Sequence, residues 1–189
     1  DTDLWRLVAA EPRFMPHLHL SLQAGDDMVL KRMKRRHLRD DAIAMCRYAR
    51  ELRPDVAFGA DIIAGFPTET EEMFENTLNI VDECDLTWLH VFPYSPRPGT
   101  PAAKMPQVNG KIRKERARLL REKGREKVDQ LLNRHINNDL RVVVEQDNIG
   151  RTGHFAEVRI DSDQTLETGR LATVRTTGAE DSKLVGHLV

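Results

Sequence analysis

The sequence predicts an α/β fold with parallel strands, followed by a small all-β domain. Strand-like and helix-like segments alternate between residues 17 and 95, in the order strand, helix, strand, helix, strand. This order is typical of parallel strands joined by helical crossovers, as in an α/β barrel or an open sheet. From Leu140 onward, short alternating apolar runs separated by turn residues indicate a barrel or sandwich.

The first predicted strand is HLHLSLQ, residues 17–23, in which polar and apolar residues alternate with the period of a strand. One face carries the polar residues His17, His19, Ser21 and Gln23. Because branched apolar side chains normally fill the interior of an α/β barrel, a polar face indicates an interior that holds a ligand. Gln23 lies at the carboxyl end, where α/β folds bind their ligands.

Two helices are predicted between the first and second strands. Residues 24–37 indicate a turn and a short basic helix, and residues 40–53 have apolar residues at helical spacing. Asp40 or Asp41 is the expected N-cap of the second helix, and Pro54 is expected to end it.

The second strand is predicted over residues 56–66, an apolar run that only Asp61 interrupts. A carboxylate in such a strand is costly unless it is paired, so Asp61 is either a ligand-binding group or the partner of a helix end or an arginine. Thr68 and Glu71 have capping-box spacing for the next helix. A third strand over residues 87–95 brings His90, Phe92 and Tyr94 to the same rim.

A proline-rich segment and a long helix follow the third strand. Residues 93–106 hold five of the nine prolines and predict an extended loop. Residues 111–135 predict a basic helix with the inward stripe Ala117, Leu120, Gly124, Val128 and Leu131. Residues 104–127 carry 10 Lys/Arg against 3 Asp/Glu, which indicates either a polyanion contact or a solvated helix face. We expect a first domain over residues 1–135 and a β domain over residues 136–189.

Composition excludes several classes of protein. A hydrophobic fraction of 40% and a charged fraction of 31% are ordinary for a soluble globular protein. No apolar run is long enough to span a bilayer and no signal segment opens the chain, so we predict no membrane contact and a cytoplasmic location. With only Cys46 and Cys84, a disulfide framework or zinc ribbon is not expected.

Two further functions remain open from the residues alone. In the first, the protein is a metal-dependent hydrolase in which His17 and His19, two residues apart on one strand face, bind a metal together with Asp61. The alternative is that each histidine is simply hydrogen-bonded within the core. The basic helix and the β domain also allow a non-catalytic RNA-binding module.

Three long stretches resemble one family in order and spacing. LHLSLQAGDDMVLKRMKRRH, FGADIIAGFPTETEE and WLHVFPYSPRPGTPAAKM resemble the second half of the radical S-adenosylmethionine (SAM) barrel of tRNA methylthiotransferases. These stretches most resemble the branch of the family that acts on N6-threonylcarbamoyladenosine at position 37, beside the anticodon. GRTGHFAEVRI resembles the RNA-binding TRAM domain of this family, so the resemblance implies a partial (β/α) radical-SAM barrel followed by a TRAM-like barrel.

The resemblance implies an enzyme with SAM and two [4Fe-4S] clusters, which adds a methylthio group to C2 of the modified adenine. A 5′-deoxyadenosyl radical from SAM would abstract the C2 hydrogen, and a second SAM would methylate the inserted sulfur. The implied partner is the tRNA anticodon stem-loop. The chemistry belongs to the cofactors, and the protein supplies position and electrostatics.

The resemblance also implies roles for individual residues. Gln23 and Asp61 are similar to ribose-contacting residues, Arg35 to the arginine that reaches the cofactor, and Ile63 to the apolar contact under the adenine. The adenine pocket would also include Tyr94 and Ser95, and Ser21 shares the polar face with Gln23. The departure is Ala24, where the family often has serine, so a hydroxyl contact is absent there.

The family's three-cysteine motif and its auxiliary-cluster cysteines are missing from this sequence. Because Fe–S clusters need several thiolates, we expect this chain alone to be inactive, with those cysteines lying upstream in a complete protein. Three strands also leave an open sheet edge, so we expect the fragment to self-associate, to misfold in part or to borrow a strand from a partner.

RNA contacts are expected from two regions. The basic helix offers positive charges to phosphates through Arg113, Lys114, Arg118 and Arg121. In the β domain, the candidates for phosphate contact and base stacking are Arg151, His154 and Phe155.

Overall fold

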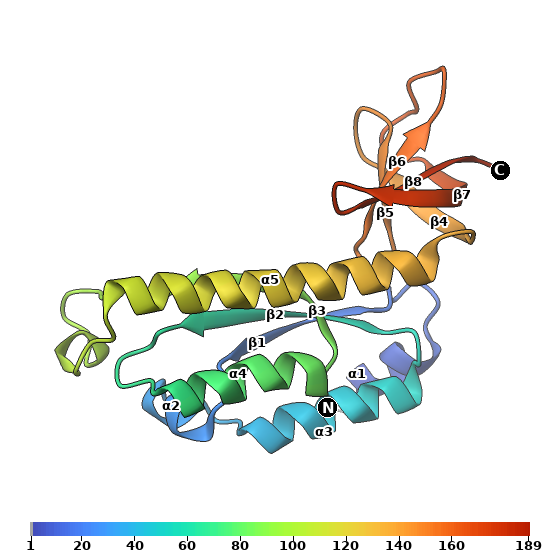
Figure 1. Ribbon diagram of the computed structural model, residues 1–189. Helices are drawn as coiled ribbons and strands as arrows, with labels where there is room; N and C mark the ends of the chain where they lie inside the picture. Colours follow the sequence, from blue (N-terminus) through green and yellow to red (C-terminus); the bar gives the residue numbers. More distant parts are fainter. Residues whose placement is uncertain (1) are drawn as a thin grey trace. The chain divides into compact units, whose positions relative to one another are not determined.

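The computed structural model describes residues 2–189, which form two compact units (Figure 1). One unit holds residues 2–10 and 18–127, and the other holds residues 11–17 and 128–189. The division falls inside helix α5 (Gly110–His135), between Lys127 and Val128. The sequence pattern alone placed a boundary near residue 135 because strand-like alternation begins only after this helix.

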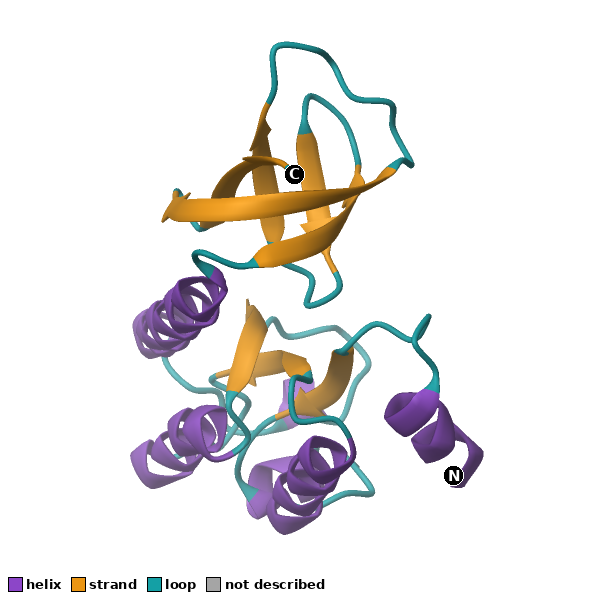
Figure 2. Cartoon of the chain, turned by 90° about the vertical axis from the view of Figure 1, so that its right-hand side faces the viewer, coloured by secondary structure: helices purple, strands orange, loops and turns teal. Residues whose placement is uncertain are grey.

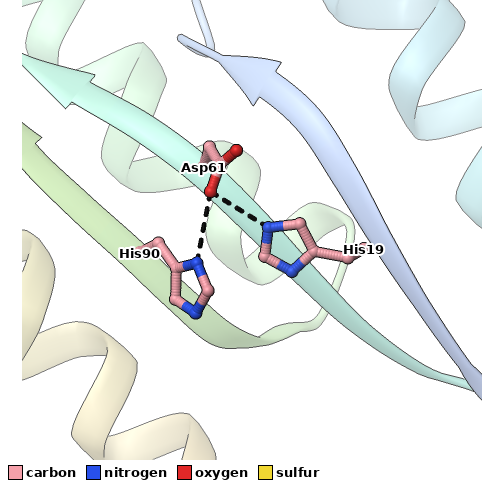
Figure 3. A group of neighbouring side chains, drawn as sticks. All are labelled: His19, Asp61 and His90. Carbon is pink, nitrogen blue, oxygen red and sulfur yellow. Dashed lines mark hydrogen bonds and ion pairs between the residues drawn. The ribbon is translucent and has the colours of Figure 1, made fainter.

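The first unit is built on a parallel α/β pattern, as the sequence predicted. Strands β1, β2 and β3 lie side by side in that order, β2 and β3 pair in parallel, and all three arrows point the same way in Figure 3. Its elements are α1 (Thr2–Ala10), β1 (His17–Gln23), α2 (Asp27–Arg32), α3 (Arg39–Leu52), β2 (Ala57–Ala64), α4 (Glu71–Glu83), β3 (Leu86–Pro93), the 3₁₀ helix η1 (Ala102–Lys104) and the first part of α5.

The two predicted helix caps were wrong by a few residues. Helix α3 begins at Arg39, so Asp41 is not its N-cap but lies in the first turn, where its carboxylate accepts a hydrogen bond from the Leu38 N–H at 2.8 Å. Helix α4 is capped by Thr70, whose hydroxyl accepts from the Met73 N–H at 3.3 Å. Thr68 is instead in a loop with a left-handed backbone (φ 68°), which a residue at the N-cap does not adopt.

The predicted end of α3 is confirmed, whereas the predicted extended loop is wrong in part. Helix α3 ends at Leu52, before Pro54, which confirms the expected stop. The proline-rich segment is not wholly extended, because the short helix η1 (Ala102–Lys104) lies within it and tolerates the prolines that flank it.

The core of the first unit lies between the sheet and the helices packed around it (Figure 2), and its buried helical residues come from α3, α4 and α5. Alternate β2 residues enter this core and are fully buried: Phe58, Ala60, Ile62 and Ala64. The intervening residues Gly59, Asp61 and Ile63 therefore point to the opposite face. The same alternation puts Leu22 of β1 into the core and leaves Ser21 exposed.

The second unit is a closed five-stranded barrel with the strand order β4-β5-β6-β8-β7. Its strands are β4 (Asp139–Val144), β5 (Ile149–Thr152), β6 (Glu157–Asp161), β7 (Leu171–Glu180) and β8 (Lys183–Leu188). The sequence pattern missed β5, because four residues are too few to show a period. Closure pairs every strand on both sides and so removes the free edges of the sheet.

No helix among residues 2–189 is both long enough and apolar enough to cross a membrane.

Candidate functional site

Three polar side chains, one from each strand of the first unit, meet on the face that α3 and α4 do not cover (Figure 3). His19 Nε2 lies 3.0 Å from Asp61 Oδ1, and His90 Nδ1 lies 3.3 Å from the same oxygen. The strand register brings them together, because Asp61 of β2 pairs directly with His90 of β3. The buried-strand carboxylate is thus partnered by two imidazoles.

A glycine makes this arrangement possible. Gly59 precedes Asp61 by two residues and faces the same side of β2. A Cβ at Gly59 would lie only 2.5 Å from His19 Nδ1. The missing side chain therefore gives the His19 ring its place over β2.

A cavity of about 450 Å³ opens at the carboxyl ends of the strands. It is lined by Gln23, Asp61, Ile63, Phe92, Pro93, Tyr94, Ser95, Arg97, Thr100 and Ala102. Gln23, Asp61, Ile63, Tyr94 and Ser95 were expected at such a site. The loop residues Arg97, Thr100 and Ala102 were missed because nothing in a proline-rich segment indicates how it folds back.

Gln23 ends β1 with a left-handed backbone (φ 73°). This conformation is uncommon for a residue other than glycine, and it occurs often at functional sites. The strand therefore turns sharply at the cavity, and the Gln23 side chain is one of the groups that line it.

Arg35 lies beside the same region. Its Nη2 donates to the carbonyl oxygen of Ser21 at 2.6 Å, which fixes the guanidinium next to β1. A second hollow, of about 360 Å³, is lined by Arg35 together with Gln23 and Ile63. Ser21 and His19 border a third hollow, of about 480 Å³, again with Arg35.

The loop after β2 is held by a buried ion pair. Arg116 of α5 donates to Glu69 Oε1 at 2.9 Å, and both side chains are buried, with exposed fractions of 6% and 1%. Glu69 Oε1 also accepts from the Gly65 N–H at 3.0 Å. Burial raises the pKa of the Glu69 carboxyl even though Arg116 opposes the shift.

Most of the basic residues in α5 have partners within the first unit. Arg113 donates to the Tyr94 carbonyl at 2.8 Å, and Arg121 to the Val91 carbonyl at 3.1 Å. Arg118 pairs with Glu115 at 2.7 Å and with Glu122. Of the four cations predicted to contact RNA, Lys114 and Arg121 are exposed without an ion pair among the described residues, and Arg121 is held by its carbonyl hydrogen bond.

The candidate RNA residues of the second unit also contact each other. Arg151 pairs with Glu145 at 2.8 Å, and its guanidinium lies 4.6 Å from the centre of the Phe155 ring. Phe155 is 45% exposed and stacks on His17, with ring centres 5.0 Å apart. His17 is not a member of the group of His19, Asp61 and His90, so the hydrolase hypothesis does not hold for this residue.

The two cysteines do not suit an iron–sulfur cluster. Cys46 and Cys84 are fully buried. A hydrogen bond between the two thiols, together with burial, raises the pKa of Cys46. A [4Fe-4S] cluster is held by about three or four cysteine thiolates, so the two buried cysteines of this chain do not fit such a cluster. The residues that line the cavity at the strand ends do fit SAM, because they combine a carboxylate, an amide and apolar side chains.

Known proteins share the sequence of this chain over long stretches. Residues 3–81 match the family model of the Radical SAM superfamily. The whole chain is 50% identical to the threonylcarbamoyladenosine tRNA methylthiotransferase MtaB of Rickettsia prowazekii. The chain belongs to the radical SAM superfamily.

Other relatives of this radical SAM chain are also named as enzymes that modify tRNA. MtaB of Aquifex aeolicus is 34% identical over 92% of the chain. The tRNA-2-methylthio-N(6)-dimethylallyladenosine synthase of Rickettsia felis is 34% identical over 99% of it. The chain spans less than half the length of these relatives: 44%, 42% and 44% for the three proteins.

A solved structure supports the fold. Coproporphyrinogen III oxidase (HemN) from Escherichia coli, a radical SAM enzyme, matches 94% of the chain and 44% of its own chain with a TM-score of 0.52. At 17% identity this likeness concerns the fold alone. It agrees with the partial radical SAM barrel expected for the first unit.

Proposed function

We propose that this chain is part of a tRNA methylthiotransferase and that its first unit binds SAM. We further propose that the modified nucleoside is N6-threonylcarbamoyladenosine beside the anticodon, at C2 of the adenine. The observation that carries the proposal is the cavity at the strand ends, lined by Gln23, Asp61 and Ile63. The name of the relative with 50% identity supports the choice of nucleoside.

Each lining group has a role that its chemistry suits. The Asp61 carboxylate accepts hydrogen bonds from ribose hydroxyls, Gln23 lines the same cavity, and Ile63 offers an apolar surface to the adenine. Ser21, two residues before Gln23 on β1, is a further candidate for a hydroxyl contact. The Arg35 guanidinium, fixed by Ser21, suits the carboxylate of the methionine part. Tyr94 lies edge-on against Phe66, with ring centres 5.3 Å apart, and this contact orients it at the cavity.

When bound, SAM supplies the radical chemistry and the methyl group. In this proposal the two [4Fe-4S] clusters belong to the complete enzyme, and residues outside this chain hold them. What this chain's own residues do is to bind the cofactor, orient it and exclude water from it.

The RNA contacts are proposed for Lys114 of α5 and for the TRAM-like barrel, with Arg113, Arg118, Arg121, Arg151, His154 and Phe155 as further candidates. Lys114 suits a phosphate because it is exposed and needs no rearrangement of an ion pair. Such an enzyme would act in the cytoplasm, on tRNA.

The first experiment is nucleoside mass spectrometry of tRNA from cells in which the gene is deleted. We expect loss of the methylthio group from threonylcarbamoyladenosine and its return with the wild-type gene. Loss from an isopentenyl-type adenosine instead would keep the chemistry and correct the substrate. An unchanged profile in a strain without a second such enzyme would overturn the proposal.

Cofactor binding is tested on the purified chain by calorimetric titration with SAM. We expect Asp61→Asn to weaken binding at least tenfold, while Asp163→Asn, an exposed residue of the second unit, leaves it unchanged. Salt-dependent tRNA binding without any SAM binding would favour the non-catalytic RNA-binding module.

A further inference from the structure

The face opposite the helices carries three possible metal ligands that the proposed cofactor site does not use together. His19, Asp61 and His90 each offer one ligand atom, and these atoms all lie within 4.8 Å of one another. In Figure 3 both imidazoles point toward the same oxygen of Asp61. It is the only group of three or more such ligands among residues 2–189.

The donor set matches the chemistry of divalent transition metals. Two imidazole nitrogens and one carboxylate oxygen are ligands that zinc and its neighbours prefer, at metal–ligand distances of about 2.0–2.2 Å. Ligands at those distances around a tetrahedral ion lie about 3.3–3.6 Å from each other. The separations of 3.0 Å and 3.3 Å from Asp61 Oδ1 to the two nitrogens come close to that spacing.

The three ligands come from a rigid frame. Each stands on a different strand of one sheet, so their spacing is fixed by backbone pairing and does not depend on a loop. Gly59 makes room for the His19 ring, because a Cβ there would lie 2.5 Å from Nδ1. The backbone at Gly59 therefore holds the His19 imidazole in place before any ion binds.

The group is also open on one side. The exposed fractions of the His19, Asp61 and His90 side chains are 32%, 30% and 58%. A structural zinc site is closed by a fourth protein ligand, whereas a site that acts on a substrate keeps a position for water. Three ligands with partial exposure match the second kind.

We propose that His19, Asp61 and His90 form a binding site for one divalent transition-metal ion of the zinc type, with its remaining positions open to water or to a substrate group. The site differs from an iron–sulfur site because it uses no thiolate. It is also compatible with the proposed SAM site, since both histidines contact Oδ1 and leave Oδ2 of Asp61 for another ligand.

The test is calorimetric titration of the chelator-treated 189-residue chain with zinc chloride, repeated with cobalt(II) and read by visible absorption. We expect one ion per chain. His19→Asn, Asp61→Asn and His90→Asn should each weaken zinc binding at least tenfold, and the double variant His19→Asn/His90→Asn should abolish it. Circular dichroism of each variant checks that the chain is folded.

A control separates this site from other histidines. His135 and His154 also lie close, with ring centres 4.7 Å apart, so His135→Asn tests whether that pair is responsible. We expect zinc binding of His135→Asn to equal that of the wild type. Zinc binding that is lost in His135→Asn, or that persists in the folded double variant, would overturn the proposal, as would a wild-type chain that binds no ion. SAM is absent from these titrations, so their failure leaves the proposed function standing, and the reverse holds as well.

Discussion

Gly59 of β2 leaves the space that the imidazole of His19 on β1 occupies, since a Cβ on Gly59 would lie 2.5 Å from His19 Nδ1. Real atoms do not approach so closely, so any larger residue must displace the ring. Nε2 of the His19 ring in turn lies 3.0 Å from Asp61 Oδ1. A residue without a side chain therefore determines the position of a polar one.

Gly59→Ala should move His19 away from Asp61 and weaken zinc binding at least tenfold while the chain stays folded. Gly178→Ala is the matched control, because a Cβ there would have open space around it. Titration calorimetry and a thermal melt of both variants check this. Wild-type affinity in Gly59→Ala would show that the His19 ring does not depend on this space.

Arg116→Ala should destabilise the first unit by about 3–5 kcal/mol, because it leaves Glu69 buried without its partner. Arg118→Ala, which removes an exposed arginine from the same helix, should cost less than about 1 kcal/mol. Urea unfolding followed by tryptophan fluorescence measures both, since Trp5 and Trp88 lie in the first unit. Equal losses would contradict the structural role of the buried pair.

The barrel should lose stability in acid. A hydrogen bond from Lys183, and a second from Arg151, hold the pKa of the Glu157 carboxyl below its usual value of 4.5. A depressed pKa gives stability that is present above the usual pKa and is lost as pH falls through the lowered one. Glu157→Gln should therefore be less stable than wild type at neutral pH, and the two should converge between about pH 5 and pH 2. Amide exchange of β6, measured by NMR, follows this unit; a constant difference across the range would refute the assignment.

Cys46 and Cys84 should not react with thiol reagents in the native chain, because both are fully buried. The interaction between the two thiols raises the pKa of Cys46 and lowers that of Cys84, so burial is the reason that both should be unreactive. A colorimetric thiol assay should find no reactive thiol under native conditions and both after unfolding in guanidinium. Rapid native labelling would mean that α3 and the end of α4 separate readily.

Local periodicity predicted the three strands of the first unit, whereas the pairing between those strands determined which side chains meet at the site. HLHLSLQ had the period of a strand, and β1 covers those same residues. His19, Asp61 and His90 were each noticed, but only the register that pairs Asp61 with His90 puts them in one group. Local pattern carries no information on register between strands that are joined by a helix.

The basic helix shows the same limit for charge. Its excess of Lys and Arg was visible in the sequence, whereas many of its partners were not. Lys127 pairs with Asp82 and Asp85 at 3.0 Å and 3.1 Å, and these carboxylates lie some 40 residues earlier. Net charge over a segment therefore overstated how much of it is available to RNA.

The left-handed backbone of Gln23 implies that the chain gives up some folding stability to keep a side chain at this position. A side chain in this conformation costs of order 1–3 kcal/mol, which glycine would avoid. A chain selected for thermal endurance alone would carry glycine there and would melt at a higher temperature. Keeping an amide at the cavity gives up part of that stability, so a glycine variant would be more stable and, under the proposed role of Gln23, would bind the cofactor more weakly.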